Sequence, residues 1–113
     1  MAAKYAHINF KPPAGAAAAA KAALRVRSEK PPSQRGMTPV GLARANQLIR
    51  RDTLSPATVK RMLAYFTRHQ KDKQGSTWKD KGKGWQAWNG WGGDAGWAWA
   101  RKVVKQMDAA DKA

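Results

Sequence analysis

The pattern of apolar and polar residues between positions 54 and 69 predicts an amphipathic helix with a basic outer face. Its apolar residues recur at spacings of three and four, which places them along one stripe: Val59, Met62, Leu63 and Phe66. Ser55 suits the N-cap position because its hydroxyl can accept a hydrogen bond from the first turn, and Pro56 suits the first helical position. The basic residues fall away from the apolar stripe: Lys60, Arg61 and Arg68.

Two more helices are predicted before this one. Residues 14–29 are rich in alanine, the residue with the highest helix propensity. Thr38 and Pro39 repeat the cap-plus-proline signal and open a helix that extends to about Arg51. Its predicted inner stripe is Leu42, Ala45 and Ile49. The polar stripe on the opposite side is Arg44, Gln47 and Arg51. Because the link at residues 52–54 is short, we expect this helix and the next to pack as a hairpin or a helix-turn-helix pair.

The carboxyl-terminal part of the chain is rich in tryptophan. Trp85, Trp88 and Trp91 recur every three residues, which predicts a short helix ended by the glycines that follow. Asp94 is expected to cap a last helix that runs to about Asp108. The residues expected to face inward from this helix are Trp97, Ala100, Val104 and Met107.

The six tryptophans allow two interpretations. They could form a platform on which single-stranded bases stack, or they could fill the centre of a domain that has little other apolar mass. Their helical spacing and the lack of interleaved basic residues favour the core. Trp78, which lies among lysines, and Trp99, which lies off the stripe of Trp97, are the expected exceptions.

These elements predict an all-α fold: a small helical bundle with a helix-turn-helix-like pair, a tryptophan-rich core and a basic amino-terminal arm. We expect residues 1–36 to form the arm and the alanine-rich helix, and to serve partner binding rather than folding. Residues 37–110 form the predicted helical domain, with a lysine-rich loop at 70–84, and residues 111–113 a tail.

The charge of the chain predicts an anionic partner. Twenty-two lysines and arginines oppose seven acidic residues, which gives a net charge of +15. So large a surplus strains the folded state through self-repulsion. Nucleic acid is the first candidate partner, an acidic protein surface the second and anionic lipid a distant third. The absence of cysteine excludes disulfides and thiolate metal sites.

The positive charge is concentrated before residue 85. The candidate contacts in this part of the chain form two groups. The predicted nucleic-acid contacts are Arg44, Arg51, Lys60, Arg61, Arg68, Lys71, Lys73, Lys79, Lys81 and Lys83. The predicted partner-binding residues of the arm are Tyr5, Phe10, Lys11, Lys21 and Arg25.

Residue types that support catalysis are sparse. His7 and His69 are the only histidines, and neither is accompanied by a cluster of glutamates. No carboxylate pair on one helix face suggests acid–base chemistry, and the glycines around Lys83 do not form a phosphate-cradling loop. We therefore expect no enzymatic activity, no cofactor, no metal site and no small-molecule substrate.

Two local motifs resemble known families. The run Leu54-Ser55-Pro56-Ala57-Thr58-Val59 resembles the start of the recognition helix in bacterial helix-turn-helix repressors, although the preceding turn has Arg51-Asp52-Thr53 where that family has a glycine. A wider resemblance is to a small domain encoded by tailed bacteriophages. It is carried by Thr38-Pro39-Val40-Gly41 with Ala43-Arg44-Ala45, by residues 54–69, and by residues 88–100 with Gly92-Gly93-Asp94-Ala95-Gly96. That resemblance implies a viral source and a connection to phage heads or phage DNA, but no mechanism.

Two functions are consistent with these observations. The first is a non-enzymatic phage protein that binds nucleic acid, DNA in the first place, through phosphate contacts. The second is a structural head protein, a minor capsid or cement protein, whose arm grips an acidic capsid surface. Since no segment approaches the roughly 20 apolar residues that span a bilayer, we expect the protein in the host cytoplasm or the virion rather than in a membrane.

Overall fold

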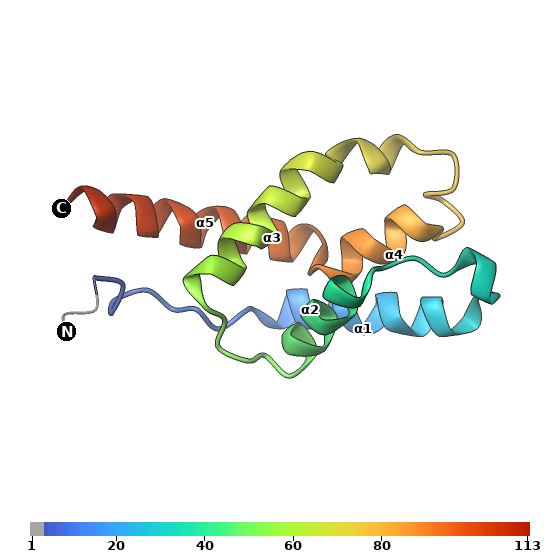
Figure 1. Ribbon diagram of the computed structural model, residues 1–113, viewed down its shortest axis with the longest axis horizontal. Helices are drawn as coiled ribbons and strands as arrows, with labels where there is room; N and C mark the ends of the chain where they lie inside the picture. Colours follow the sequence, from blue (N-terminus) through green and yellow to red (C-terminus); the bar gives the residue numbers. More distant parts are fainter. Residues whose placement is uncertain (1–3) are drawn as a thin grey trace.

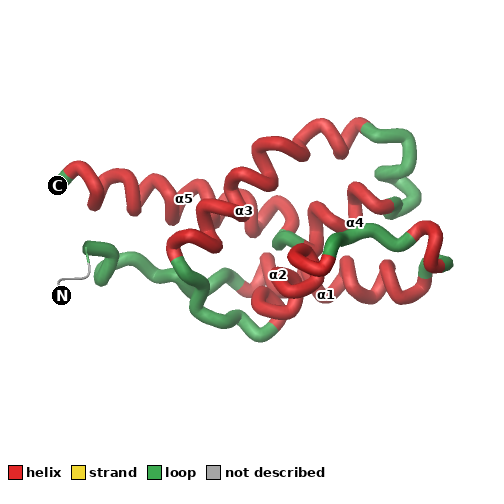
Figure 2. Tube along the Cα trace, in the orientation of Figure 1, coloured by secondary structure: helices red, strands yellow, loops and turns green. Residues whose placement is uncertain are grey.

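The computed structural model describes residues 4–113, which form five α-helices joined by turns and two 3-10 segments (Figures 1 and 2). The helices are α1 (Ala14–Glu29), α2 (Pro39–Ile49), α3 (Pro56–His69), α4 (Lys83–Gly90) and α5 (Gly93–Lys112), and the 3-10 segments are η1 (Pro32–Gln34) and η2 (Gln70–Gln74). The described part of the chain contains no strand. The predicted all-α class is therefore confirmed.

The two cap-plus-proline signals start α2 and α3 as predicted. The hydroxyl oxygen of Thr38 accepts a hydrogen bond from the N–H of Gly41 at 3.1 Å. Ser55 accepts one from the N–H of Thr58 at the same distance of 3.1 Å. Each cap pairs an amide that would otherwise have no partner at the start of a helix.

Helix α2 ends at Ile49, slightly earlier than predicted, because the chain turns sharply there. Arg51 takes the left-handed conformation, with φ of 53°, that glycine usually supplies at this position of a helix end. The N–H of Asp52 bonds to the carbonyl of Gln47 at 3.0 Å, and the N–H of Arg51 to that of Leu48 at 3.0 Å. An arginine thus makes the turn without the glycine of the repressor families.

The alanine-rich helix α1 is part of the helical assembly and not of a separate arm. It packs against α2, α4 and α5, and its residues Ala16, Ala20 and Ala23 are fully buried. Its small side chains match the glycines between α4 and α5: a Cβ atom at Gly93 would lie 2.9 Å from the Cβ of Ala19. The predicted division at residue 36 is thus not a packing boundary, because a helix of small residues approaches its neighbours closely enough to bury backbone.

Helices α2 and α3 do not pack on each other as the expected pair. The main neighbours of α2 are α1 and α4, whereas α3 crosses and packs against α5 and makes few contacts with α2 (Figure 1). The alanine-rich helix packs against α2 instead. The helix-turn-helix resemblance is therefore limited to the cap and first turn of α3.

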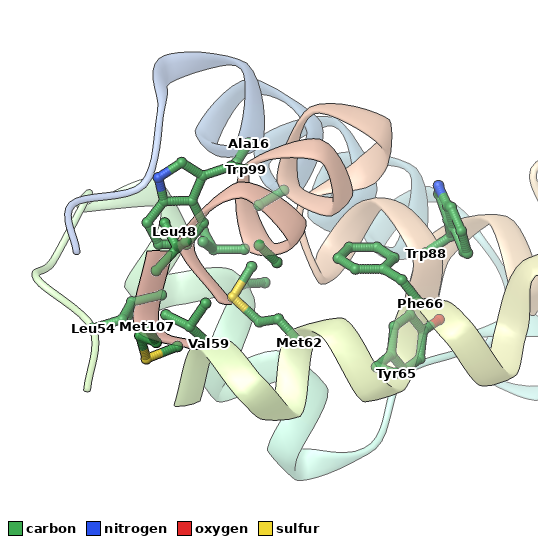
Figure 3. Close-up of a cluster of buried hydrophobic side chains, with 14 of the residues drawn as sticks. Ala16, Leu48, Leu54, Val59, Met62, Tyr65, Phe66, Trp88, Trp99 and Met107 are labelled. Atoms are coloured by element: carbon green, nitrogen blue, oxygen red, sulfur yellow. The ribbon is translucent and has the colours of Figure 1, made fainter. Parts of the chain in front are cut away.

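The core is built around tryptophan, as the spacing predicted, but the stripe of α5 differs. Trp88 is 1% exposed and Trp99 only 7% exposed, so Trp99 belongs to the core rather than being an exception. Figure 3 shows Trp99 between α5 and the side chains of Leu48 and Ala16. The buried residues of α5 are Gly93, Gly96, Trp99, Ala100, Val103 and Met107. Because α5 contacts both α1 and α3, its buried face is wider than a single stripe, and Trp97 and Val104 are only half-buried at its edge.

The amino-terminal segment lies along the carboxyl-terminal end of α5, so both ends of the described chain are on one side of the molecule (Figure 1). The hydroxyl of Tyr5 donates a hydrogen bond to Asp111 at 2.7 Å, and Lys4 forms an ion pair with the same carboxylate at 2.8 Å. Asp111 lies within α5, which continues to Lys112, beyond the predicted end near Asp108. Only Ala113 follows the helix, so the predicted tail is almost entirely helical.

Candidate nucleic-acid interface

A stripe of exposed cations runs along the outer face of α3 and continues into η2. We define this basic stripe as Lys60, Arg61, Arg68 and Lys71, all of which are exposed. Between its two ends lie Ala64 and Thr67, which are also exposed and carry short side chains. No described residue forms an ion pair with any cation of the stripe. The stripe spans about 16 Å at 1.5 Å per residue, and its charge is free to meet an anion.

The stripe has a fixed orientation because the opposite face of α3 is buried. Val59, Met62 and Phe66 are fully enclosed in the core (Figure 3). Rotation of α3 would expose these side chains, at a cost of about 1.5–3 kcal/mol for each. The helix therefore presents its cations in one geometry.

Beside the stripe, α3 forms one wall of a groove of about 700 Å³. We call it the α3 groove; it is bounded by α3, by the linker between η1 and α2, and by the start of α4. Four cations line it, Arg35 and Lys83 opposite Arg61 and Arg68. Its apolar lining residues are Met37, Val40, Ala64, Ala87 and Trp91. Arg35 is a candidate contact that the sequence pattern did not single out, because it lies in a linker without periodicity.

A buried glutamine holds the linker wall of the groove in place. Gln86 is fully buried, and its side-chain oxygen accepts a hydrogen bond from the N–H of Gly36 at 2.7 Å. Its amide nitrogen donates to the carbonyls of Gln34 and Lys81, each at 3.1 Å. A buried side chain that fills its hydrogen-bonding capacity in this way fixes the segments it joins. Gln86 thereby positions Arg35 on one side of the groove and the start of α4 on the other.

A column of stacked side chains forms the inner end of the groove. Tyr65 stacks on Trp91, with ring centres 4.7 Å apart and planes within 6° of parallel. On its other face Tyr65 stacks on His69 at 4.5 Å. The guanidinium of Arg44 covers the far face of Trp91, 5.3 Å from the ring centre. The column thus runs from His69 through Tyr65 and Trp91 to Arg44.

Arg44, predicted as a nucleic-acid contact, is instead a core residue. It is only 6% exposed and donates a hydrogen bond to the side chain of Gln47. Burial lowers its pKa below the usual range, and the nearby charge of Arg61 lowers the pKa further. Its place on the predicted polar stripe was wrong because α2 buries the face that carries Gly41, Arg44, Ala45 and Leu48. A guanidinium enclosed in this way is not available to a phosphate.

His69, at the other end of the column, is held by a carboxylate. Its Nδ1 lies 3.0 Å from a carboxylate oxygen of Asp72. Asp72 is the one acidic residue that lines the groove, and this contact occupies it. The buried hydroxyl of Tyr65 has no hydrogen-bond partner among the described residues, and burial raises its pKa well above the usual range.

Two further predicted contacts already have partners within the protein. Lys73 forms an ion pair with Asp94 at 2.6 Å, and its ammonium lies 4.8 Å from the ring centre of Trp88. The guanidinium of Arg51 donates to the carbonyl of Pro12 at 2.9 Å, although the residue is exposed. Neither is as free as the cations of the basic stripe.

Asp94 serves a different role from the predicted helix cap. Helix α5 begins after Gly92, and Asp94 lies in its first turn without capping it. Its carboxylate accepts hydrogen bonds from Lys73 and, at 3.0 Å, from the indole N–H of Trp88. The Lys73 contact in particular holds the pKa of this carboxyl below its usual value. Asp94 therefore links η2 to the tryptophan core.

The remaining lysines of the predicted loop are exposed. Lys81 lies over the ring of Trp85, 5.3 Å from its centre, while Lys79 extends from the turn before it. Lys83 begins α4 and lines the α3 groove. Of these three lysines, only Lys83 lines the α3 groove together with Arg61 and Arg68 of the basic stripe.

The predicted partner-binding residues of the arm divide by chemistry. Tyr5 and Phe10 pack partly buried against the core of this chain, with ring centres 6.2 Å apart. Lys11, Lys21 and Arg25 are exposed. The apolar members therefore serve the fold, and only the cations remain available to a partner.

Within residues 4–113 no group of histidines and carboxylates gathers in an arrangement that would hold a metal ion. In the same range no helix is both long and apolar enough to cross a membrane.

Comparisons with protein-family models, with curated proteins and with solved structures gave no match for this chain. The resemblances to a phage domain and to helix-turn-helix repressors thus stay predictions from the quoted motifs.

Proposed function

We propose that this protein binds nucleic acid through its phosphates, without catalysing a reaction. The observation that carries the proposal is the basic stripe of α3, whose cations are exposed, held in register by a buried opposite face and free of ion pairs with described residues. Cations of this kind replace the counterions that condense on a nucleic-acid backbone, and the released counterions favour binding.

The groove strengthens this proposal because it adds cations from other elements. Arg35 and Lys83 stand opposite Arg61 and Arg68 across the α3 groove. The net charge of +15 would also steer an anionic polymer toward the protein over long distances. The proposed contact set is therefore Lys60, Arg61, Arg68, Lys71, Lys83 and Arg35, without Arg44 and Lys73.

The alternative, a head protein that grips an acidic capsid surface with its arm, has less support. That function needs apolar arm residues free to contact the partner, whereas Tyr5 and Phe10 contact the core of the chain itself. The exposed cations of α1, Lys21 and Arg25, are the contacts that remain for it. These two residues provide a matched control for the stripe.

The test compares two double variants that remove the same charge from two surfaces. Fluorescence anisotropy with a labelled oligonucleotide would measure the affinity of Lys60→Gln/Arg61→Gln and of Lys21→Gln/Arg25→Gln. We expect the first variant to bind about tenfold more weakly and the second to bind nearly as the unchanged protein, because only the first removes stripe contacts. Equal losses would attribute binding to net charge alone, and a larger loss in the α1 variant would favour the arm.

A further inference from the structure

The α3 groove is lined by two kinds of chemistry, and together they restrict the nucleic acid that would fit it. We infer that the groove holds unpaired nucleotides, so that the protein prefers single-stranded to duplex nucleic acid. This inference rests on the proposed function and specifies the substrate of the same site.

The rim of the groove selects an anion. Arg61 and Arg68 line one side and Arg35 and Lys83 the other, and all four are exposed. The only acidic lining residue, Asp72, is already paired with His69. Phosphates would therefore meet positive charge on both sides of the groove.

The floor of the groove selects a ligand that also carries an apolar face. Met37, Ala64, Ala87 and Trp91 line it, and Val40 at its edge is 56% exposed. Among the described residues, Val40 is the large apolar side chain that the fold leaves exposed. A duplex keeps the faces of its bases stacked inside and presents only phosphates and groove edges, whereas unpaired bases offer their faces to a protein.

The stacked column supplies a place for a base. His69 ends the column, and its side chain is 39% exposed while one face rests on Tyr65. Histidine rings and arginine guanidinium planes are both surfaces on which unpaired bases stack. A base placed against His69 would extend the column, with its phosphates beside Arg61 and Arg68.

The size of the groove agrees with this occupant. Its volume of about 700 Å³ falls within the roughly 300–1,000 Å³ typical of sites that enclose a small organic group. The groove would thus take a nucleotide or two, while the basic stripe would follow the backbone beyond it.

Four probes separate the possible ligands of this site. They are a short oligothymidylate, a hairpin duplex with the same number of phosphates, inorganic polyphosphate of matched length and an oligoglutamate of matched charge. We expect the oligothymidylate to compete for the protein at about one tenth of the concentration that each of the other probes needs, since a stacked base contributes substantially to affinity. A duplex or an oligoglutamate that competes equally well would overturn the inference.

Filling the groove should abolish the preference without removing charge. Ala64→Leu adds apolar bulk at an exposed groove position of α3, and Ala57→Leu is the matched control, exposed on the same helix but outside the groove. We expect Ala64→Leu to weaken oligothymidylate binding to the level of polyphosphate and to leave polyphosphate binding unchanged. His69→Gln, which keeps a hydrogen-bonding group near Asp72 but removes the ring, should do the same. Retention of the full preference in both variants would overturn the inference.

The two proposals fail in distinguishable ways. If none of the probes bound, the proposed function itself would be wrong. If oligothymidylate, duplex and polyphosphate bound alike and neither groove variant mattered, only the preference for unpaired nucleotides would be wrong.

Discussion

At the scale of single residues, Trp88 is the most deeply buried tryptophan of the core. Its indole packs edge-on against Phe66 and Trp97, with ring centres 4.8 and 5.4 Å away. Its N–H donates to Asp94, which in turn binds Lys73. The residue therefore joins α3, α4, α5 and η2.

Truncation of this ring should unfold much of the population. We expect Trp88→Ala to lower the free energy of unfolding by about 3–5 kcal/mol, the usual cost of removing a buried aromatic side chain. That loss is a large part of the stability of a typical small domain. Urea denaturation would measure it, with Trp85→Ala as the control because Trp85 is only half-buried and lies outside the core cluster. A Trp88→Ala protein as stable as this control would contradict the proposed role of the ring.

The Asp94 carboxylate makes the stability of the fold depend on pH. Its pKa is lower in the folded state than in the unfolded chain, where an aspartate titrates at about 3.9. Its contribution is therefore fully present above that value and is lost as the pH falls through the lower folded pKa.

Asp94→Asn should accordingly lower the melting temperature at neutral pH but not in acid. The effect should be small, below about 1 kcal/mol, because the side chain is largely exposed and such ion pairs are weak. Thermal unfolding at pH 7 and near pH 2 would show the difference closing in acid. Asp80→Asn is the control, since this exposed carboxylate has no ion pair with a described residue. A difference of equal size at both pH values would exclude the ionised carboxylate as its cause.

The sequence predicts which residues of a helix are buried most accurately where that helix packs against the core through a single face. Of the predicted stripe of α3, Val59, Met62 and Phe66 are buried because one face of that helix meets the core. Leu63 is only half-buried, and Tyr65 is buried in addition. Arg44 and Trp99 were misplaced because α2 and α5 each contact more than one helix, so their buried faces are broader than a stripe. The column of His69, Tyr65, Trp91 and Arg44 joins α3, the turn after α4 and α2, and it has no signal in local spacing.

At the scale of elements, α1 is the helix whose packing the sequence pattern does not predict. Alanines carry little apolar area, so their pattern predicts no strong apolar stripe and groups α1 with the amino-terminal arm. The surface that α1 packs against also lacks an apolar pattern, since it includes the glycines that begin α5. Here the close approach of backbones, rather than large side chains, buries the surface: a Cβ at Gly15 would lie 2.9 Å from that of Ala95.

A matched pair of substitutions tests the packing of α1. Ala20 is fully buried, whereas Ala18 on the same helix is exposed. Replacing Ala20 by leucine should cost about 1–3 kcal/mol of folding free energy, because the added bulk would force the helices apart. Ala18→Leu should change stability by less than about 0.5 kcal/mol. Equal stability of the two variants in urea denaturation would show that α1 does not pack as described.

The helix boundaries were largely predictable because their signals are local. The caps at Thr38 and Ser55 and the prolines after them define the starts of α2 and α3. The packing of these helices was not predictable, since a short link constrains distance but not which neighbour a helix covers. The α3 groove depends on that packing, and only its basic α3 wall and Lys83 could be anticipated.

At the scale of the whole molecule, charge and burial divide the chain into a core side and a basic side. Residues 85–113 carry little net charge and supply most of the tryptophan core. Exposed cations of α3, of the linker before α2 and of the start of α4 gather around one groove: Arg61, Arg68, Arg35 and Lys83. The protein therefore presents a positive surface on a rigid support.

The central claim, that phosphates are neutralised by this surface, is tested most directly by the salt dependence of binding. The proposed contact set has six cations, of which Arg35 also donates hydrogen bonds to the carbonyls of Lys30 and Ser28. A log–log plot of affinity against salt should therefore be linear, with a slope of magnitude roughly 3 to 5. Lys60→Gln/Arg61→Gln should reduce that magnitude by about one unit or more, and Lys21→Gln/Arg25→Gln should leave it unchanged. A slope near zero, or one that is insensitive to both double variants, would contradict the account.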